Sequence, residues 1–237
     1  MSTDTATVAE EEYLQILFWL QEACLPMTGA NVARAMQLSA PTVHEMIGRL
    51  ERDGYVTRGQ DRVIAFTDEG ATHAEGIVRR HRLIERFLTD VLGVPWDEVH
   101  EEAERLEHAM SPVLERRMLA AIGDATTCPH GHPLVAGERL SGVPLADVDV
   151  GASVRVLRFE NEAEDLLHYL KSSGLEPGLR GTLAVSDDAE VVLETDDGTR
   201  CAVTPSVAET VSVIADPSPP PRTALPEQLV LGQRYGR

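Results

Sequence analysis

The first third of the chain carries apolar residues at the spacing of α-helices. The pattern predicts three helices, over residues 10–21, 29–38 and 41–54. A hydroxyl residue, Thr28 or Ser39, precedes each of the two later helices and can cap their free backbone N–H groups. The beginning of the chain therefore predicts three short helices in series.

The next segment changes to the two-residue period of β-strands. Residues 55–70, YVTRGQDRVIAFTDEG, read as two short strands joined at GQDR, which predicts a hairpin. Helix, turn, helix and a two-stranded wing form the order of a winged helix-turn-helix DNA-binding domain. We place this domain at residues 1–70.

Helical periodicity returns in the middle of the chain. It predicts helices over residues 69–92, 97–108 and 112–121, with enough apolar surface for a core and a dimer interface. A segment rich in glycine and proline, GDATTCPHGHPLV, follows as a connector. We place a helical dimerisation and metal-binding domain with this connector at residues 71–137.

The last part of the chain alternates strand-like runs with turns, interrupted by one short helix, AEDLLHYLKSSG. This pattern predicts a small β-barrel over residues 138–214. The proline-rich residues 215–237 are expected to be disordered. The predicted fold class is thus mainly α with a small β domain.

The net charge of −18 needs an explanation in a DNA-binding protein, because phosphate contacts usually require basic surface. The charge is uneven: residues 25–66 hold five arginines against four acids, whereas residues 138–216 hold sixteen acids against six bases. Lys171 is the only lysine, a composition typical of a halophilic archaeon. At molar salt, counterion release adds little to DNA affinity, so base contacts and shape matter more.

Targeting signals and a disulfide framework are both missing from the pattern. No apolar run approaches the roughly 20 residues that cross a bilayer, and the acidic start is unlike a secretory leader. Three widely spaced cysteines suit a reducing compartment. We therefore expect a cytoplasmic protein that does not enter a membrane.

The run HEEAERLEH carries the clearest chemistry in the sequence. It sets His100, Glu104, Glu107 and His108 on one face of a helix. A further pair, four residues apart on the preceding helix, consists of His81 and Glu85. Imidazoles and carboxylates are the ligands of divalent transition metals, so a metal site beside a DNA-binding head predicts a metal-sensing transcription factor.

Several segments together resemble the diphtheria toxin repressor family of metal-dependent regulators. They are SAPTVHEMIGRLERDGYV, RRHRLIERFLTDVLG, HEEAERLEHAMS and CPHGHP, and the similarity runs from about Glu10 to Val213. The resemblance implies a homodimeric repressor of metal-uptake genes that binds double-stranded operator DNA when loaded with metal. It also implies that the final β domain is FeoA-like.

The same resemblance implies two metal sites per subunit, for Mn(II) or Fe(II). The primary site would consist of Glu12, Glu104, Glu107 and His108, and the ancillary site of His81, Glu85 and His100 with a carboxylate of the C-terminal domain. Ala163 aligns with that last ligand, and of the flanking Glu162 and Glu164 we take Glu164. His81 also serves the primary site in manganese-sensing relatives, and some relatives use the equivalents of Cys128 and His130.

Some of these assignments have simpler interpretations. Glu12 is either a ligand or a first-turn acid favoured by the helix dipole. Cys128 and His130 are either ligands or polar residues of a connector. Iron-sensing relatives carry Met and Cys where this chain has Glu12 and Glu104, so its harder oxygen ligands favour Mn(II).

The DNA-binding residues are expected at the start of the third helix and in the wing. Base edges and nearby phosphates would be met by Ser39, Pro41, Thr42, His44 and Glu45, and more distant phosphates by Arg49, Arg58 and Arg62. Glu45 suits a contact with cytosine, or it is simply exposed to solvent.

Two other functions compete with the sensor. A metal-dependent hydrolase could use the same cluster, but a His-Glu-x-x-His motif fails because residue 104 is Glu. A constitutive DNA-binding protein with a structural metal is the other alternative. We therefore predict no catalytic residues and no enzyme.

Overall fold

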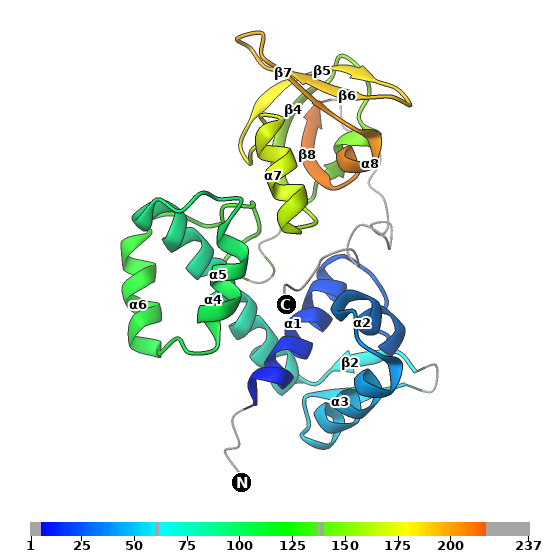
Figure 1. Cartoon of the computed structure of the whole chain (residues 1–237), viewed down its shortest axis with the longest axis vertical. Coiled ribbons are helices and arrows are strands. Elements are labelled where there is room, and N and C mark those ends of the chain that lie inside the picture. The colour runs from blue at the N-terminus through cyan, green and yellow to red at the C-terminus, as the bar shows by residue number, and fades with distance from the viewer. Residues whose placement is uncertain (1–5, 60–61, 136, 138–139, 217–237) are drawn as a thin grey trace.

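The computed structural model describes residues 6–59, 62–135, 137 and 140–216, which form three units (Figure 1). The first is a winged helix. It contains α1 (Val8–Glu22), α2 (Gly29–Met36), α3 (Ala40–Arg52), β1 (Val56–Arg58) and β2 (Ile64–Phe66). The two strands pair antiparallel, as the hairpin pattern predicts.

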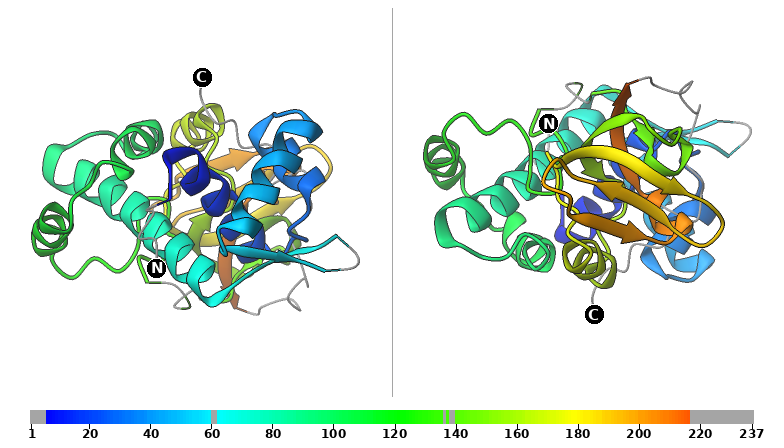
Figure 2. Two further views of the ribbon diagram at one scale, coloured as in Figure 1. Left: turned by 90° about the horizontal axis from the view of Figure 1, so that it is seen from below. Right: turned by 90° about the horizontal axis from the view of Figure 1, so that it is seen from above.

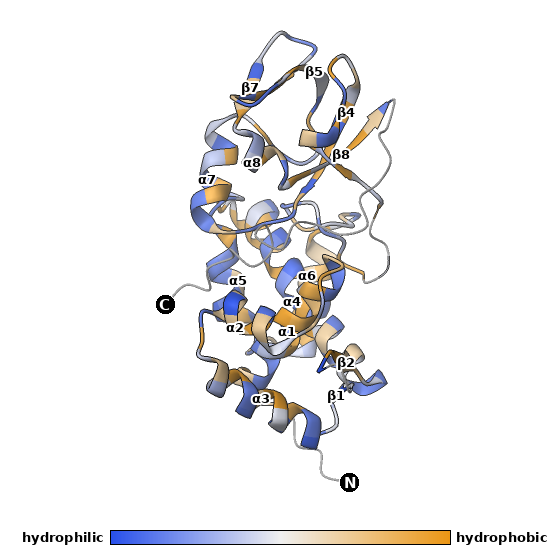
Figure 3. Cartoon of the chain, turned by 90° about the vertical axis from the view of Figure 1, so that its right-hand side faces the viewer, coloured by the Kyte–Doolittle hydropathy of each residue, from blue (hydrophilic) through white to orange (hydrophobic). Residues whose placement is uncertain are grey.

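Hydroxyl side chains begin all three helices of this unit. Thr28 and Ser39 accept hydrogen bonds from backbone N–H groups in the first turns of α2 and α3. Figure 3 shows α3 alternating between hydrophilic and hydrophobic residues, with its apolar side turned into the core. Leu14, Leu17 and Leu50 are fully buried there, so the head has a hydrophobic core of its own.

The second unit is helical and is built on α4 (Asp68–Leu92), α5 (Val99–Glu107) and α6 (Pro112–Ala121). The 25 residues of α4 span about 37 Å at 1.5 Å per residue. Both views in Figure 2 show α4 running from the winged helix to the other two helices. One long helix therefore connects the DNA-binding head to the middle of the molecule.

The third unit is an antiparallel sheet with the strand order β3-β8-β4-β5-β6-β7. Its strands are β3 (Val143–Pro144), β4 (Ser153–Phe159), β5 (Arg180–Ser186), β6 (Val191–Glu194), β7 (Arg200–Val203) and β8 (Val211–Asp216). The helix α7 (Glu164–Ser172) connects β4 to β5. Buried Phe159, Leu167 and Leu170 join the sheet and α7 in one core.

The sheet is not the closed barrel that the strand pattern predicts. Within residues 140–216, the two outer strands β3 and β7 each pair with one neighbour only. The strand β3 is two residues long and ends in Pro144, which has no N–H group to extend a ladder. Two short helices that the sequence pattern does not predict, η1 (Leu145–Asp147) and α8 (Pro205–Ala208), also belong to this unit.

Two further expectations concern the tail of the chain and membrane-spanning segments. The tail at residues 217–237, expected to be disordered, lies beyond the described residues. Among the described helices, none is long and apolar enough to cross a membrane.

Candidate metal centre

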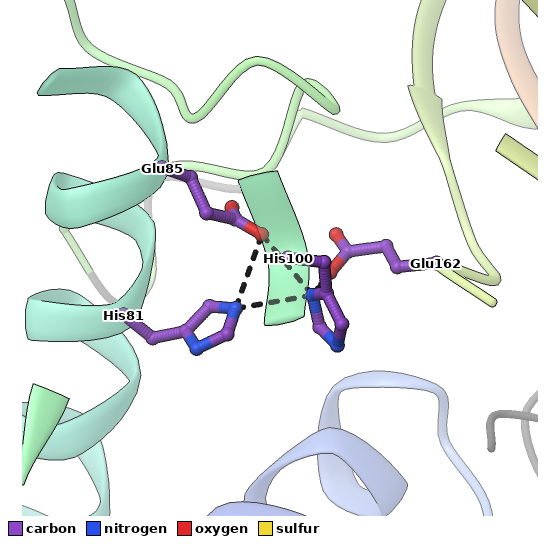
Figure 4. A group of neighbouring side chains, drawn as sticks. All are labelled: His81, Glu85, His100 and Glu162. Atoms are coloured by element: carbon purple, nitrogen blue, oxygen red, sulfur yellow. Dashed lines mark hydrogen bonds and ion pairs between the residues drawn. The ribbon is translucent and has the colours of Figure 1, made fainter. Parts of the chain in front are cut away.

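Two helices bring three of the expected ligands together, as their spacing predicts (Figure 4). His81 and Glu85 lie one turn apart on α4, and His100 reaches them from α5. Glu85 Oε1 lies 3.1 Å from His81 Nε2 and 3.1 Å from His100 Nδ1. All three side chains are buried, Glu85 completely.

The fourth member of this cluster is Glu162, not the expected Glu164. Glu162 Oε2 lies 3.1 Å from His100 Nδ1, and its carboxylate is buried between the helical unit and the sheet. Ligand atoms of His81, Glu85, His100 and Glu162 all lie within 4.8 Å of one another. We call these four residues the ancillary group.

Glu164 lies outside the group because α7 begins with it. Its side chain is 53% exposed and faces His168 one turn along the helix, with 3.4 Å between Oε1 and Nε2. Glu162 precedes the helix, in the irregular segment that follows β4, and its carboxylate contacts His100. The sequence offers both residues as candidate ligands, and the structure of the loop before α7 decides between them.

The connector adds a second group that shares two of these ligands. Atoms of Glu85, Cys128, His130 and Glu162 also lie within 4.8 Å of one another, and all four residues are buried. Arg86 on α4 fixes this segment by donating to the carbonyl oxygen atoms of Thr127 and Cys128, at 2.7 Å each. We call these four residues the connector group.

A tight turn aims the connector at the sheet. Gly131 has φ +93°, and a Cβ atom there would lie 1.9 Å from the carbonyl oxygen of Leu157. His130 Nε2 lies 2.7 Å from the carbonyl oxygen of Trp96, so it donates to that oxygen and leaves Nδ1 facing Glu85. A hydrogen bond of this kind commonly orients a metal-binding imidazole.

The carboxylates of the cluster shift the pKa values of its histidines. Burial lowers the pKa of His81, but attraction to Glu85 and Glu107 outweighs burial and raises that pKa to about 9. The pKa of His100 and that of His130 also rise well above the usual range, because hydrogen bonds and charges of nearby carboxylates outweigh their burial. Without metal, protonated imidazoles thus compensate the buried carboxylates.

Some buried polar atoms indicate what these residues lack. Glu85 Oε2 is buried and has no hydrogen-bond partner among the described residues. Glu104 Oε1 and His130 Nδ1 are also buried, and their neighbours are ion-pair partners at 3.2–3.5 Å without hydrogen-bond geometry. Unpaired buried oxygen and nitrogen atoms are costly, and each needs a compensating contact. A divalent cation would supply that contact, so the donor set fits a metal ion.

The residues expected at the primary site form a looser arrangement, which we call the primary group: Glu12, Glu104, Glu107 and His108. His108 Nε2 lies 3.3 Å from Glu107 Oε1. Glu12 projects from α1 and is exposed. Desolvation by the surrounding protein raises the pKa of the Glu12 carboxyl, His108 lowers it, and Glu104 and Glu107 raise it further, so the four residues share one electrostatic environment.

Two residues of α1 that sequence reasoning missed also contact the primary group. Glu11 Oε2 lies 2.6 Å from His108 Nδ1, and Gln15 donates to Glu107 Oε2 at 3.2 Å. Both are buried on α1 and reach the C-terminal end of α5. The sequence signal for this role was that Glu11 and Gln15 lie four residues apart, about one helical turn, among apolar neighbours.

His81 and His100 connect the two sets of ligands. His81 directs Nε2 at Glu85 and Nδ1 at Glu107, with 2.7 Å between Nδ1 and Glu107 Oε2. His100 directs Nδ1 at the ancillary group and Nε2 at Glu104, 3.5 Å from its Oε1. The primary and ancillary groups are thus neighbours in one polar network.

The expected DNA-binding residues lie on the outer surface of the head. Exposed positions at the start of α3 comprise Ser39, Pro41, Thr42, His44 and Glu45. Ser39 also caps the helix, and its hydroxyl lies 2.7 Å from that of Thr42. A hollow of about 650 Å³ between α3 and the wing is lined by His44, Arg58 and Arg62.

Two of the expected phosphate ligands are engaged within the protein. Arg49 Nε lies 2.8 Å from Glu10 Oε1 on α1, and Arg58 Nε lies 2.9 Å from Glu51 Oε2 on α3. Arg62 is exposed in the wing. The Arg58–Glu51 pair is partly exposed on both sides, so exchange of Glu51 for a phosphate would cost little. Glu10 is buried, so its separation from Arg49 would cost more.

Comparison with known families divides the chain into three matches. Residues 5–63 match the family described as "Iron dependent repressor, N-terminal DNA binding domain". Residues 67–135 match "Iron dependent repressor, metal binding and dimerisation domain". Residues 143–215 match "FeoA domain".

Individual proteins show the same similarity. The chain is 35% identical to the "Iron-dependent repressor IdeR" of Mycobacterium leprae over 199 residues, which cover 77% of this chain and 86% of that protein. A solved "Manganese-dependent transcriptional repressor complex with manganese" is similar with a TM-score of 0.78 and 29% identity, covering 87% of this chain and 99% of the other. T. acidophilum IdeR is similar with a TM-score of 0.72 and 27% identity, covering 90% and 100%.

Proposed function

Because the chain belongs to the iron-dependent repressor family, it is a metal-dependent transcriptional repressor and not an enzyme, and we propose how its residues make DNA binding depend on metal. The protein acts as a homodimer on operator DNA. Glu12 of the head would hold a metal ion together with Glu104, Glu107 and His108, and this shared ligand set would fix the recognition helices at the spacing of the operator. The observation that supports the proposal is that the exposed Glu12 of the head interacts electrostatically with Glu104, Glu107 and His108 of the helical unit.

The role of metal is a matter of linkage. An ion shifts the equilibrium only by binding more tightly to the DNA-competent form than to the other forms. Glu12 is the primary-group residue of the head, so its position differs between an open and a closed arrangement. Glu11, the neighbour of Glu12 on α1, already contacts His108, and this contact keeps α1 close to the other residues of the primary group.

The ancillary group would hold a second ion and join the helical unit to the sheet. His81, Glu85, His100 and Glu162 supply two nitrogen and two oxygen ligands. The bound ion supplies a compact positive charge that the buried carboxylates otherwise obtain from protonated imidazoles. In this role the second ion stabilises the protein on which the primary site is built.

The identity of the ion follows from the hardness of the ligands. Three carboxylates and one imidazole in the primary group favour Mn(II), although Fe(II) is also compatible with them. The names of the similar proteins include both iron-dependent and manganese-dependent repressors. We propose Mn(II) as the preferred activator and Fe(II) as the competitor.

Exposed apolar residues support a dimer formed by the helical unit. At the end of α4, in α5 and in α6, large apolar side chains are between 44% and 61% exposed: Val91, Leu92, Leu106, Val113 and Leu114. Apolar side chains concentrated in this way commonly mark an interface. A second copy of the chain would cover them and place two heads side by side.

The charge of the protein sets the conditions under which it works. With a net charge of −18, we propose that the repressor operates at high intracellular salt, where repulsion from DNA is screened. The hollow beside His44, Arg58 and Arg62 is the proposed contact surface for the operator backbone. Arg49 and Arg58 would exchange their carboxylate partners for phosphates.

The proposal is tested by binding to the protein's own promoter region in high-potassium buffer, with Mn(II), anaerobic Fe(II) or Zn(II), each against a chelator control. We expect retention of DNA only with metal, and saturation at a lower concentration of Mn(II) than of Fe(II). DNA binding that ignores the chelator would make the metal structural and contradict the proposal.

A further inference from the structure

A polar contact joins the sheet unit to the helical unit and contains none of the proposed metal ligands. It is centred on Asp97, just before α5, whose side chain is only 6% exposed. On α7, His168 donates from Nδ1 to Asp97 Oδ2 at 2.7 Å, and Lys171 pairs with Oδ1. We call Asp97, His168 and Lys171 the clamp.

The clamp connects the two segments that carry ligands of the ancillary group from different units. Asp97 lies three residues before His100, and Glu162 lies two residues before the start of α7. Glu162 belongs to neither a helix nor a strand, so no regular hydrogen-bond pattern fixes its backbone. Its 3.1 Å approach to His100 therefore depends on how α7 sits against the helical unit.

We propose that Asp97 is a positioning residue of the ancillary group: through His168 and Lys171 it holds α7 where Glu162 can reach the ion. This inference rests on the proposed function, because it concerns how the ancillary ion is held. The clamp itself binds no metal. It completes the ligand set from outside.

The attachment of α7 to the sheet is the first argument. Leu167 and Leu170 on α7 are completely buried in the core of the sheet unit. Figure 1 shows α7 on the side of the sheet that faces the helical unit. Because α7 is packed into the sheet, the clamp holds the sheet unit as a whole and not a loose helix.

The charge of Asp97 gives the second argument. Burial raises the pKa of Asp97, but hydrogen bonds from Lys171 and His168 outweigh burial and lower that pKa below its usual range. A buried carboxylate that loses such partners costs far more free energy than an exposed ion pair. Asp97 therefore favours the arrangement in which α7 lies against the helical unit.

The neighbouring Trp96 gives the third argument. Its ring packs on the core of the sheet, 5.5 Å from the ring of Phe159. Apolar packing is non-directional, so Trp96 brings the two units together without fixing their orientation. The two contacts of Asp97 have directions, and they supply the orientation that Glu162 needs.

The test measures Mn(II) binding to the full-length, metal-stripped protein, with free Mn(II) followed by electron paramagnetic resonance. The ancillary part of the isotherm is the part that Glu162→Ala weakens. We expect Asp97→Asn to weaken the same part by about 10-fold, the lower end of the usual effect of groups that orient ligands. Asp165→Asn is the matched control, because Asp165 is exposed on α7, and it should leave both parts unchanged.

A double-variant cycle separates positioning from general stability. In the Glu162→Ala protein the positioned ligand is already missing, so adding Asp97→Asn should change Mn(II) affinity by less than about twofold. If Asp97→Asn weakened binding equally with and without Glu162, its effect would not pass through Glu162, and the inference would be overturned. Unchanged affinity in the single variant Asp97→Asn would overturn it as well.

Chemical modification tests the clamp without any substitution. Lys171 is the only lysine of the chain, so acetylation of amines in the folded protein removes its charge, whereas reductive dimethylation retains it. Both reagents also modify the N-terminal amine, and acetylated Glu162→Ala controls for that reaction. We expect weaker ancillary binding only in the acetylated protein with Glu162. Equal affinities after the two modifications would overturn the inference, even if Asp97→Asn fails to fold.

The outcomes separate this inference from the proposed function. Weaker Mn(II) binding in Asp97→Asn, in a protein whose operator binding ignores metal, would contradict the proposed function alone. Metal-dependent operator binding with unchanged Mn(II) affinity in Asp97→Asn would overturn the clamp alone. Mn(II) binding that ignores Glu162→Ala would overturn both the ancillary assignment and the clamp.

Discussion

The ancillary and primary groups differ in how completely they are assembled. The ancillary group is closed, with Glu85 fully buried against three imidazoles. The primary group is open, since its carboxylate from α1, Glu12, is exposed. The difference follows from where the ligands originate, because the ancillary group contains no residue of the winged helix.

This contrast indicates which site can act as a switch. A group that is already assembled moves little when metal binds, so it is suited to stabilising the protein. A group with one ligand on the winged helix must bring that ligand to the others, so binding would change the position of the head. The proposed function therefore assigns the role of sensor to the primary group and that of support to the ancillary group.

The largest expected effect is on the assembled group. Glu85→Ala removes a completely buried carboxylate and leaves protonated imidazoles uncompensated, which should lower the free energy of unfolding by about 3–5 kcal/mol. Chemical denaturation in the presence of a chelator measures this. Glu164→Ala is the control, because its exposed side chain should matter by less than about 0.5 kcal/mol. Equal losses in the two variants would contradict the contrast between the buried Glu85 of the group and the exposed Glu164 outside it.

The pH dependence of metal binding comes next in size. The pKa of His81 rises from 6.5 to about 9 in the folded protein, so protonated His81 stabilises the metal-free fold below pH 6.5. That contribution, on the order of 3 kcal/mol, is lost as pH rises through 9. Metal requires the neutral imidazole, so it should bind more tightly over the same window and release a proton.

Thermal unfolding at pH 6.5 and pH 9 measures both effects, once with chelator and once with Mn(II). We expect the stabilisation by Mn(II) to grow towards pH 9, while the stability of the metal-free protein falls. If the stabilisation by Mn(II) did not change with pH, metal binding would not displace the proton of His81.

A smaller effect is expected at the residue that supports the open group. Glu11 accepts from His108 Nδ1, and such contacts typically contribute about 10–100-fold to metal affinity. Glu11→Gln should therefore weaken Mn(II) binding at the primary site by roughly that factor. Isothermal titration measures the change, with Glu190→Gln, an exposed position in the sheet unit, as control. Unchanged affinity in Glu11→Gln would remove Glu11 from the support of His108.

The sequence predicts the helices and the candidate ligands on them. It does not predict features that depend on irregular segments. Periodicity is sufficient to locate α4 and α5, and regular helices then bring His81, Glu85 and His100 together. The choice between Glu162 and Glu164 depends on where α7 begins, which periodicity does not resolve. Closure of the sheet is a long-range property that depends on the two-residue strand β3.

Partners of individual side chains were equally hard to foresee. Arg49 and Arg58 have the spacing of phosphate ligands, yet each pairs with a carboxylate of a neighbouring element. Gln15 and Glu11 read as incidental polar residues of an apolar helix. Their role depends on the packing of α1 on α4, a contact between segments that are distant in the sequence.

The most direct test of the account is the reciprocity of metal and DNA binding at Glu12. If metal tightens operator binding by a given factor, usually about 5–150-fold, operator DNA must tighten metal binding by the same factor. Mn(II) affinity is measured with and without operator, in the wild type, in Glu12→Ala and in the control Gln21→Ala, an exposed position on the same helix. We expect equal factors in the wild type and the control, and a factor near one in Glu12→Ala with the fold retained. Undiminished coupling in Glu12→Ala would contradict the claim that the open group is the switch.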